Sequence, residues 1–207
     1  MNRATKIVAS SLGLFLALSG LDHGIFEMLQ GNAPTNALVI DAIGPAHIMW
    51  QHGAESAFTI LPNFLITGIV SILVGIALFV WSLWFIDGKH GVKVLVLLTV
   101  LLFLFGGGIG APVVFGPLAW VAARRINKPL QKKASGVFAK FWRYTLTIAW
   151  ISSLIGLFVA ITGYIPGISP SEADRILMID LAFVFIGGWL MFLVSLLSAQ
   201  ASDAKSA

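Results

Sequence analysis

The stretch Gly106-Gly107-Gly108-Ile109-Gly110-Ala111-Pro112 decides how this chain folds, because it interrupts an apolar run that covers residues 92–123. As one continuous helix this run would be about 48 Å long, well beyond the roughly 30 Å of a bilayer core. Glycine and proline each weaken a helix by removing backbone order or a hydrogen bond. Two arrangements are open at this point: one broken span, or a hairpin of two short helices that turns at the glycines.

The rest of the sequence is typical of a membrane protein. Hydrophobic residues make up 58% of the 207 residues and charged residues 11%, whereas soluble domains carry about 25% charged residues. A soluble fold of this size has too little interior for so many apolar side chains, which excludes soluble enzymes and nucleic-acid-binding modules. The chain is predicted to form a single domain, 1–207. Four further runs of apolar residues in it are long enough to cross a bilayer as helices. They cover residues 7–30, 58–86, 144–164 and 176–198, with a polar outer segment at 31–57 and a basic loop at 124–143.

The distribution of charge favours the hairpin. Lysine and arginine in short loops mark the cytoplasmic side of a membrane protein. A single crossing by residues 92–123 leaves 5 of the 13 basic residues on that side, whereas a hairpin leaves 12 there and only Arg175 outside. We therefore predict an all-α integral membrane helix bundle with four full spans plus a Gly-rich helical hairpin, with five to six hydrophobic helices in total. Both termini are expected in the cytoplasm, and the membrane is expected to be the plasma (inner) membrane.

The first span has an alternative interpretation as a cleaved signal peptide covering residues 1–19. Arg3 and Lys6 precede an apolar run that ends in Ala17-Leu18-Ser19, a permissive cleavage pattern. Apolar residues resume after His23, which favours an uncleaved span. The topology of the downstream chain is the same in either case.

Small residues form stripes along the predicted spans. Such stripes let helices in lipid approach closely, so helix packing is the simplest interpretation. His23 and Glu27 lie beside the stripe of the first span and are therefore expected to face the bundle, whereas Asp22 is expected at the outer interface. The stripes consist of Ala9, Gly13, Ala17, Gly20 and Gly24; of Asn63, Thr67, Ser71 and Gly75; and of Ala149, Ser153, Gly156, Ala160 and Gly163.

Titratable side chains gather at the outer end of the predicted bundle. His23 and Glu27 are four residues apart on one helical face, and His52 and Glu55 would share a face if residues 45–58 formed a helix. Imidazole and carboxylate groups suit a divalent metal, and they equally suit proton transfer. A third interpretation is that these groups only meet water at the interface. The predicted ligand- or proton-binding residues are His23, Glu27, Asn63 and Asp180, and the candidate metal ligands are His23, Glu27, His47, His52 and Glu55.

Three functions follow from this cluster. The first is a small transporter or channel-like protein for a cation, proton or small solute, with the hairpin lining the path. The second is an intramembrane metal-binding protein or enzyme. The chain has no HExxH or CxxC motif, and no catalytic residue is assigned, so enzyme activity is the less favoured alternative. The third is a non-catalytic membrane interaction protein.

The expected partners are lipids and a second copy of the chain. The basic loop at 124–143 suits an anionic lipid surface, which accounts for the net charge of +4 without nucleic acid. A homodimer is expected because a chain of this size rarely encloses a pathway alone. A divalent metal is the one cofactor that the cluster suggests.

Three segments carry a family resemblance: LDHGIFEMLQG at residues 21–31, PNFLITG at 62–68 and GGGIG at 106–110. In these segments the chain resembles a group of small prokaryotic multi-pass membrane proteins of unassigned function. The resemblance covers roughly residues 1–125. It implies a multi-pass membrane fold and brings no activity with it.

Overall fold

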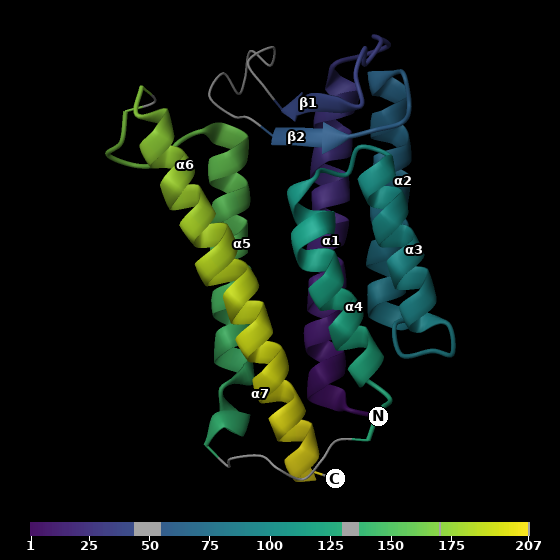
Figure 1. The fold of residues 1–207 in the computed structure, drawn as a ribbon, viewed down its shortest axis with the longest axis vertical. Coiled ribbons are helices and arrows are strands. Elements are labelled where there is room, and N and C mark those ends of the chain that lie inside the picture. The colour runs from purple at the N-terminus through teal and green to yellow at the C-terminus, as the bar shows by residue number, and fades with distance from the viewer. Residues whose placement is uncertain (44–54, 130–136, 170, 207) are drawn as a thin grey trace.

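A computed structural model describes residues 1–43, 55–129, 137–169 and 171–206, and the chain is mostly helical (Figure 1). Within these residues, four helices are long and apolar enough to cross a membrane. The prediction of a helical protein with four such helices is therefore confirmed. They are α1 (Arg3–Leu29), α2 (Phe64–Trp84), α5 (Trp142–Thr162) and the last helix, Arg175–Lys205.

Helix boundaries differ from the predicted spans by a few residues. α1 begins at Arg3 instead of residue 7, and α2 begins at Phe64 instead of residue 58. The later start of α2 has a local cause, because the Asn63 side chain accepts the N–H of Ile66 at 3.1 Å and caps the helix. The candidate span Arg175–Lys205 lies within three consecutive helical segments. These are α6 (Ala173–Leu181), a π-helical segment η4 (Ala182–Leu190) and α7 (Met191–Ser206).

The chain reverses direction at the glycine-rich stretch. α3 (Gly91–Leu104) leads into the turn, and the chain then runs back beside α3 through a π-helical segment η2 (Ala111–Phe115) and α4 (Gly116–Arg125) (Figure 1). Gly106 and Gly108 have φ angles of +92° and +86° in the turn. Glycine adopts this left-handed conformation without the steric cost that a Cβ atom imposes. Below, residues 105–110 are called the glycine turn.

α1 is the central helix, with α2, α3 and α4 on one side of it and α5, α6 and α7 on the other (Figure 1). Its small-residue stripe packs against α2. A Cβ atom on Gly24 would lie 2.7 Å from the carbonyl oxygen of Gly68, and one on Gly75 would lie 3.0 Å from that of Ala17. These backbones touch only because neither helix has a side chain at the contact, so the predicted packing role of the stripe is confirmed.

The bundle end opposite the termini carries a two-stranded antiparallel sheet, which is not among the elements predicted from the sequence. β1 (Val39–Ile43) pairs with β2 (Glu55–Phe58). The prediction of a helix over residues 45–58, which would place His52 and Glu55 on one face, is therefore wrong for residues 55–58, because these residues form a strand. Residues 44–54, which include His47 and His52, lie outside the described residues.

Backbone hydrogen bonds tie the end of β2 and the residues after it to the glycine turn and to the end of α3. The N–H of Gly106 donates to the carbonyl of Phe58 at 3.0 Å, and the N–H of Ile60 donates to that of Leu104 at 3.0 Å. These bonds satisfy polar groups of an irregular turn that would otherwise be unpaired. The sheet therefore helps to hold the glycine turn in place over α1.

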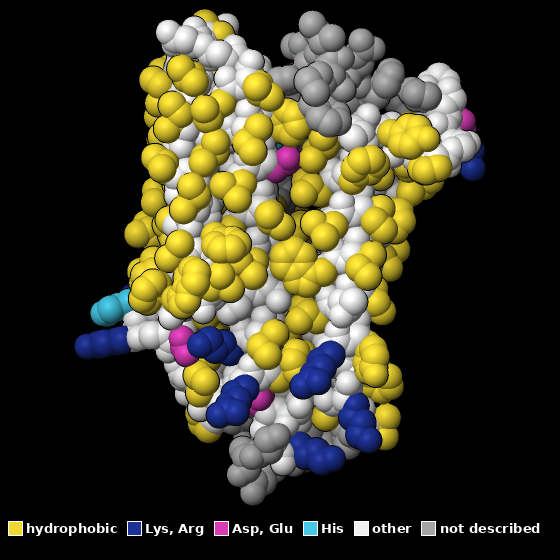
Figure 2. All heavy atoms as spheres, turned by 180° about the vertical axis from the view of Figure 1, so that it is seen from behind, with side chains coloured by type: hydrophobic (Ala, Val, Ile, Leu, Met, Phe, Trp, Pro, Cys, Tyr) yellow, Lys and Arg dark blue, Asp and Glu magenta, His cyan; other side chains and the backbone are white. Residues whose placement is uncertain are grey.

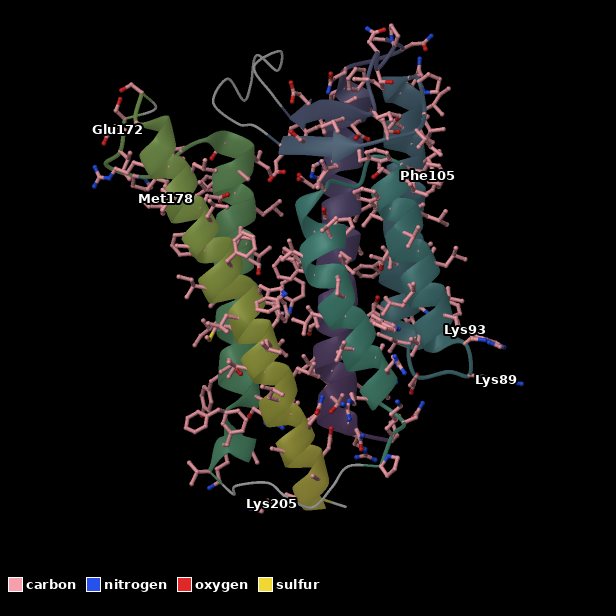
Figure 3. All side chains as sticks on the ribbon, in the orientation of Figure 1. Lys89, Lys93, Phe105, Glu172, Met178 and Lys205 are labelled. Carbon is pink, nitrogen blue, oxygen red and sulfur yellow. The ribbon has the colours of Figure 1, made fainter. Side chains whose placement is uncertain are left out.

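The two ends of the molecule differ in charge. Figure 3 shows Lys89, Lys93 and Lys205 at the end that holds both termini, and Glu172 at the opposite end. In Figure 2 the visible face has Lys and Arg side chains gathered mainly at the terminal end, beyond a broad apolar belt. A belt of this kind between unequally charged ends is typical of membrane proteins.

Side-chain contacts close the bundle at the basic end. The carboxylate of Asp203, near the end of α7, accepts the N–H groups of Ala4 and Thr5 at 3.0 and 2.8 Å. It therefore supplies the N-terminal hydrogen bonds that α1 does not obtain from its own N-cap residue, Asn2. Lys6 also donates to Asp87 at 2.7 Å, and this contact holds the pKa of that carboxyl below its usual range.

Candidate functional site

The glycine turn fits directly onto one face of α1. A Cβ atom on Gly108 would lie 2.6 Å from Nε2 of His23, and one on Gly106 would lie 2.6 Å from Oε2 of Glu27. Both distances are shorter than real Cβ contacts, so any larger residue at either position would displace the α1 side chain. The two glycines therefore leave the space that His23 and Glu27 occupy.

Glu27 lies in a closed socket behind the turn. Its side chain is completely buried, and neither carboxylate oxygen has a hydrogen-bond partner among the described residues. The methyl group of Thr67 closes the socket beside Gly106, while the Thr67 hydroxyl bonds to that of Thr59 at 3.2 Å. An unpaired carboxylate in such surroundings is costly, so Glu27 requires a proton or a bound cation.

A cleft of about 280 Å³ lies between α1 and the pair formed by α5 and α6. Figure 2 shows an acidic side chain inside a hollow of the otherwise apolar belt between the two groups of helices. Both π-helical segments, η2 and η4, contribute walls to this cleft, and π-helical turns are frequent at functional sites. The polar lining residues are Ser19, His23, Glu55, Ser153 and Asp180, and the aromatic ones are Phe15, Phe115 and Phe185.

Carboxyl groups converge at the mouth of the cleft. Glu55 lies 3.8 Å from Nε2 of His23. Burial, together with the nearby carboxylates of Asp180 and Asp22, raises the pKa of Glu55 from 4.5 to about 7. Asp22, which is expected at the outer interface, is half-buried, and one of its carboxylate oxygens is buried near Glu55.

Several polar atoms of the cleft are free to bind a ligand. Nδ1 of His23, Oγ of Ser153 and Oδ1 of Asp180 are buried, and none has a hydrogen-bond partner within the described part of the chain. Ser19 differs, since its hydroxyl donates to the carbonyl of Gly107 at 3.0 Å. Buried polar groups are nearly always paired in folded proteins, so these three atoms are the groups of the cleft with hydrogen-bonding capacity left for a ligand or water.

The structure brings three of the predicted residues, His23, Glu55 and Asp180, to one cleft, with Glu27 one turn further along α1. Asn63 is not among the lining residues. Its side chain caps α2 and donates to Oδ1 of Asn32 at 2.7 Å.

A metal site is not assembled by the described residues, which contain no group of three His, Asp or Glu side chains able to hold an ion. Two of the five predicted ligands, His23 and Glu55, do lie close together. His47 and His52 fall in the segment that the structure does not describe. The predicted metal site therefore stays a prediction.

Two lining residues, Ser19 and Ser153, escape the sequence-based prediction. Ser19 lies four residues before His23 on the same face of α1, so helical spacing alone would have found it. Ser153 is part of a small-residue stripe, and packing is the simplest interpretation of a serine in that position. Its unpaired hydroxyl distinguishes it from a packing residue only in three dimensions.

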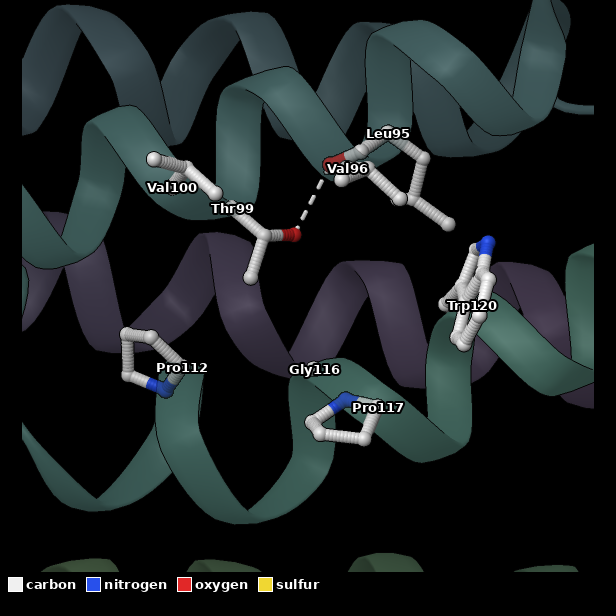
Figure 4. A pocket seen from close by; sticks show the side chains of 8 residues that line it. All are labelled: Leu95, Val96, Thr99, Val100, Pro112, Gly116, Pro117 and Trp120. Carbon is white, nitrogen blue, oxygen red and sulfur yellow. Dashed lines mark hydrogen bonds between the residues drawn. The ribbon is translucent and has the colours of Figure 1, made fainter.

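A second hollow, an apolar groove of about 360 Å³, lies between α3 and α4 (Figure 4). Its one hydroxyl, on Thr99, is already bonded to the carbonyl of Leu95 at 2.8 Å. No titratable side chain lines this groove, so the candidate site is the cleft beside α1. The groove is lined by Leu95, Val96, Thr99, Val100, Pro112, Gly116, Pro117 and Trp120.

Comparison of the chain with protein-family models, with curated proteins and with solved structures gives no match. The resemblance carried by the three sequence segments brings no activity with it. Function therefore has to be argued from the chemistry of the cleft and of the glycine turn.

The glycine turn generates a prediction with a matched control. Gly108→Ala should lower the free energy of unfolding of the detergent-solubilised protein by about 1 to 2 kcal/mol, and with it the melting temperature. Alanine disfavours positive φ, and its Cβ would meet His23. Gly110→Ala, at φ −60° with no atom within 4 Å of the added carbon, should leave stability unchanged or slightly higher. Equal melting temperatures for the two variants would contradict the described fit.

The shifted pKa of Glu55 generates a second prediction. Because the folded-state pKa of about 7 lies above the ordinary glutamate value of 4.5, the contribution of Glu55 to stability is complete below about pH 4.5 and is lost as pH rises through about 7. The melting temperature of the wild type should therefore fall relative to that of Glu55→Gln between about pH 5 and pH 8. Glu172→Gln is the control, since the Arg175 hydrogen bond lowers the pKa of Glu172. A pH-independent difference between wild type and Glu55→Gln would refute the shift.

Proposed function

We propose that this protein is a small membrane transporter or channel-like protein that moves a cation or proton, or a small solute coupled to one. The observation that carries the proposal is the set of buried, unpaired polar atoms on His23, Ser153 and Asp180 around one cleft. Ionisable side chains within membrane-spanning segments are costly and commonly mark ion paths or proton relays. In this proposal Glu27 and His23 exchange the proton or cation.

Aromatic side chains pack together on the side of the cleft that faces the basic end, and this packing supports a path that is closed on that side. Phe15 and Phe115 have ring centroids 4.6 Å apart, and Trp150 and Phe192 pack around Phe15 at 6.2 and 6.3 Å. Phe15 lies two helical turns from His23 in the direction of the termini. A transporter that alternates between its two sides requires a cleft that is closed on one side at a time.

The glycine turn and η2 are the proposed lining of the path. Gly110, Ala111 and Phe115 all line the cleft, and η2 is tied to the other helix group where Nε1 of Trp189 donates to the carbonyl of Val114 at 3.1 Å. Transporters commonly build their binding sites from interrupted helices of this kind. Movement of this contact would change access to His23.

The proposed topology places the chain in the plasma membrane with both termini in the cytoplasm. The two arms of the proposed hairpin are α3, with 14 residues, and η2–α4, with 15. They are about 21 and 22 Å long, which is shorter than a bilayer core. The hairpin therefore crosses as thin helices or dips in as a re-entrant loop shielded by α1. The basic loop at 124–143 is proposed to lie on anionic lipids. A homodimer is a further part of the proposal, although one chain forms the whole cleft.

Single cysteines test this orientation, since the chain has none of its own. Asn127→Cys, next to the basic end of α4, should react with an impermeant thiol reagent only after the cells are permeabilised. Ser171→Cys, at the opposite end next to Glu172, should react in intact cells. The reverse labelling pattern would overturn the proposed topology.

Transport is tested with purified protein in liposomes that contain a pH-sensitive dye. Under an imposed membrane potential the wild type should move protons measurably faster than empty liposomes. Glu27→Gln should reduce this flux at least tenfold, because the amide cannot release a proton. Glu172 is an exposed carboxyl outside the cleft, so Glu172→Gln should leave the proton flux unchanged. Wild-type flux equal to that of empty liposomes, tested with protons and with alkali cations, would rule out the proposal.

The second candidate is an intramembrane metal-binding protein or enzyme. Its supporting observation is the 3.8 Å separation of His23 and Glu55, two residue types that suit divalent metals. Metal analysis of the purified wild type and of His23→Ala separates the candidates. A stoichiometric metal that is lost in the variant would favour the second candidate over transport of a proton.

A further inference from the structure

We infer that the cleft binds a small organic ammonium ion, with its charged group among Glu55, Asp180 and Ser153 and its apolar part against Phe15 and Phe115. This inference rests on the proposed function and specifies the ligand class of the same site. It has three supports: the sign of the charge around the cleft, the unpaired acceptors within it, and its aromatic floor.

The charge of this end of the protein favours cations. Twelve of the 13 lysines and arginines lie in segments 1–6, 89–93 and 124–143 and at position 205, which leaves Arg175 as the one lysine or arginine that the structure describes at the other end. Arg175 does not line the cleft, and its guanidinium is 63% exposed and paired with Glu172 at 3.1 Å. Glu55 and Asp180 thus face a cleft that no lysine or arginine lines, and His23 is its one imidazole. A cleft lined by one sign of charge concentrates ions of the opposite sign.

The unpaired atoms of the cleft match the needs of an ammonium group. A primary ammonium has three donors and therefore needs several acceptors. Oγ of Ser153 and Oδ1 of Asp180 can accept and have no partner among the described residues, and Ser153 is only 1% exposed. A Cβ on Gly156 would lie 3.3 Å from Oδ1 of Asp180, so glycine at this position on α5 leaves room beside the carboxylate.

The floor of the cleft suits an apolar body more than a bare ion. Phe15 and Phe115 are 8% and 1% exposed, and both line the cleft. Aromatic faces pack against apolar groups and also attract ammonium ions through the ring quadrupole. The volume of about 280 Å³ is at the lower limit for drug-sized ligands, which indicates a one-ring or short-chain amine. A proton or a hydrated metal ion would not need this floor.

Isothermal titration of the purified full-length protein with benzylamine, which is an ammonium ion at neutral pH, tests the inference. Benzyl alcohol is the neutral control of the same shape. Benzylammonium should bind at least tenfold more tightly than benzyl alcohol. Asp180→Asn should weaken benzylammonium binding at least tenfold and leave benzyl alcohol binding unchanged, whereas Glu172→Gln should change neither. Circular dichroism and size-exclusion chromatography would show that both variants are folded.

Equal binding of the two probes, no binding of benzylammonium, or no effect of Asp180→Asn would overturn the inference. The proton-flux experiment uses no amine, so its result is independent of this test. Flux without benzylammonium binding would keep the transport function and reject the ligand class. Selective benzylammonium binding without proton or cation flux would keep the ligand class and reject transport.

Discussion

The close contact between the glycine turn and α1 is the constraint on which the rest of the structure depends. Gly106 and Gly108 meet Glu27 and His23 at distances that no Cβ atom could tolerate. This contact fixes where the chain reverses, and it therefore determines that α4 runs back to the basic end beside α1. It also encloses His23 and Glu27 of α1 within the protein, where both side chains are buried.

The same contact explains why the polar groups are distributed unequally. Glu27 is sealed behind the turn, whereas His23, one helical turn nearer to Phe15, borders the cleft and meets Glu55. The N–H of Gly106 in the turn donates to the carbonyl of Phe58, the last residue of β2. Glu55 lies on the same strand and lines the cleft, so β2 contacts both the turn and the cleft.

Much of this arrangement follows from patterns that a sequence displays. Apolar length and helical periodicity predict the four long helices, and the i, i+4 spacing of His23 and Glu27 predicts that both face the bundle. The sheet could not be predicted in this way, because its pairing joins short strands through contacts between Val39–Ile43 and Glu55–Phe58 that have no local signal. The position of Asp22 depends on that sheet, since Glu55 of β2 lies close enough to interact with it.

Charge links the proposed topology to the proposed ligand. Lysine and arginine are concentrated in segments 1–6, 89–93 and 124–143, and the proposed topology places these segments in the cytoplasm. The same distribution leaves the carboxyl groups of Glu55 and Asp180 in a cleft that no lysine or arginine lines. In the proposal, an outward cation-binding cleft and a cytoplasmic basic loop are therefore two consequences of one asymmetry, and a protein inserted in the opposite sense would present this cleft to the cytoplasm.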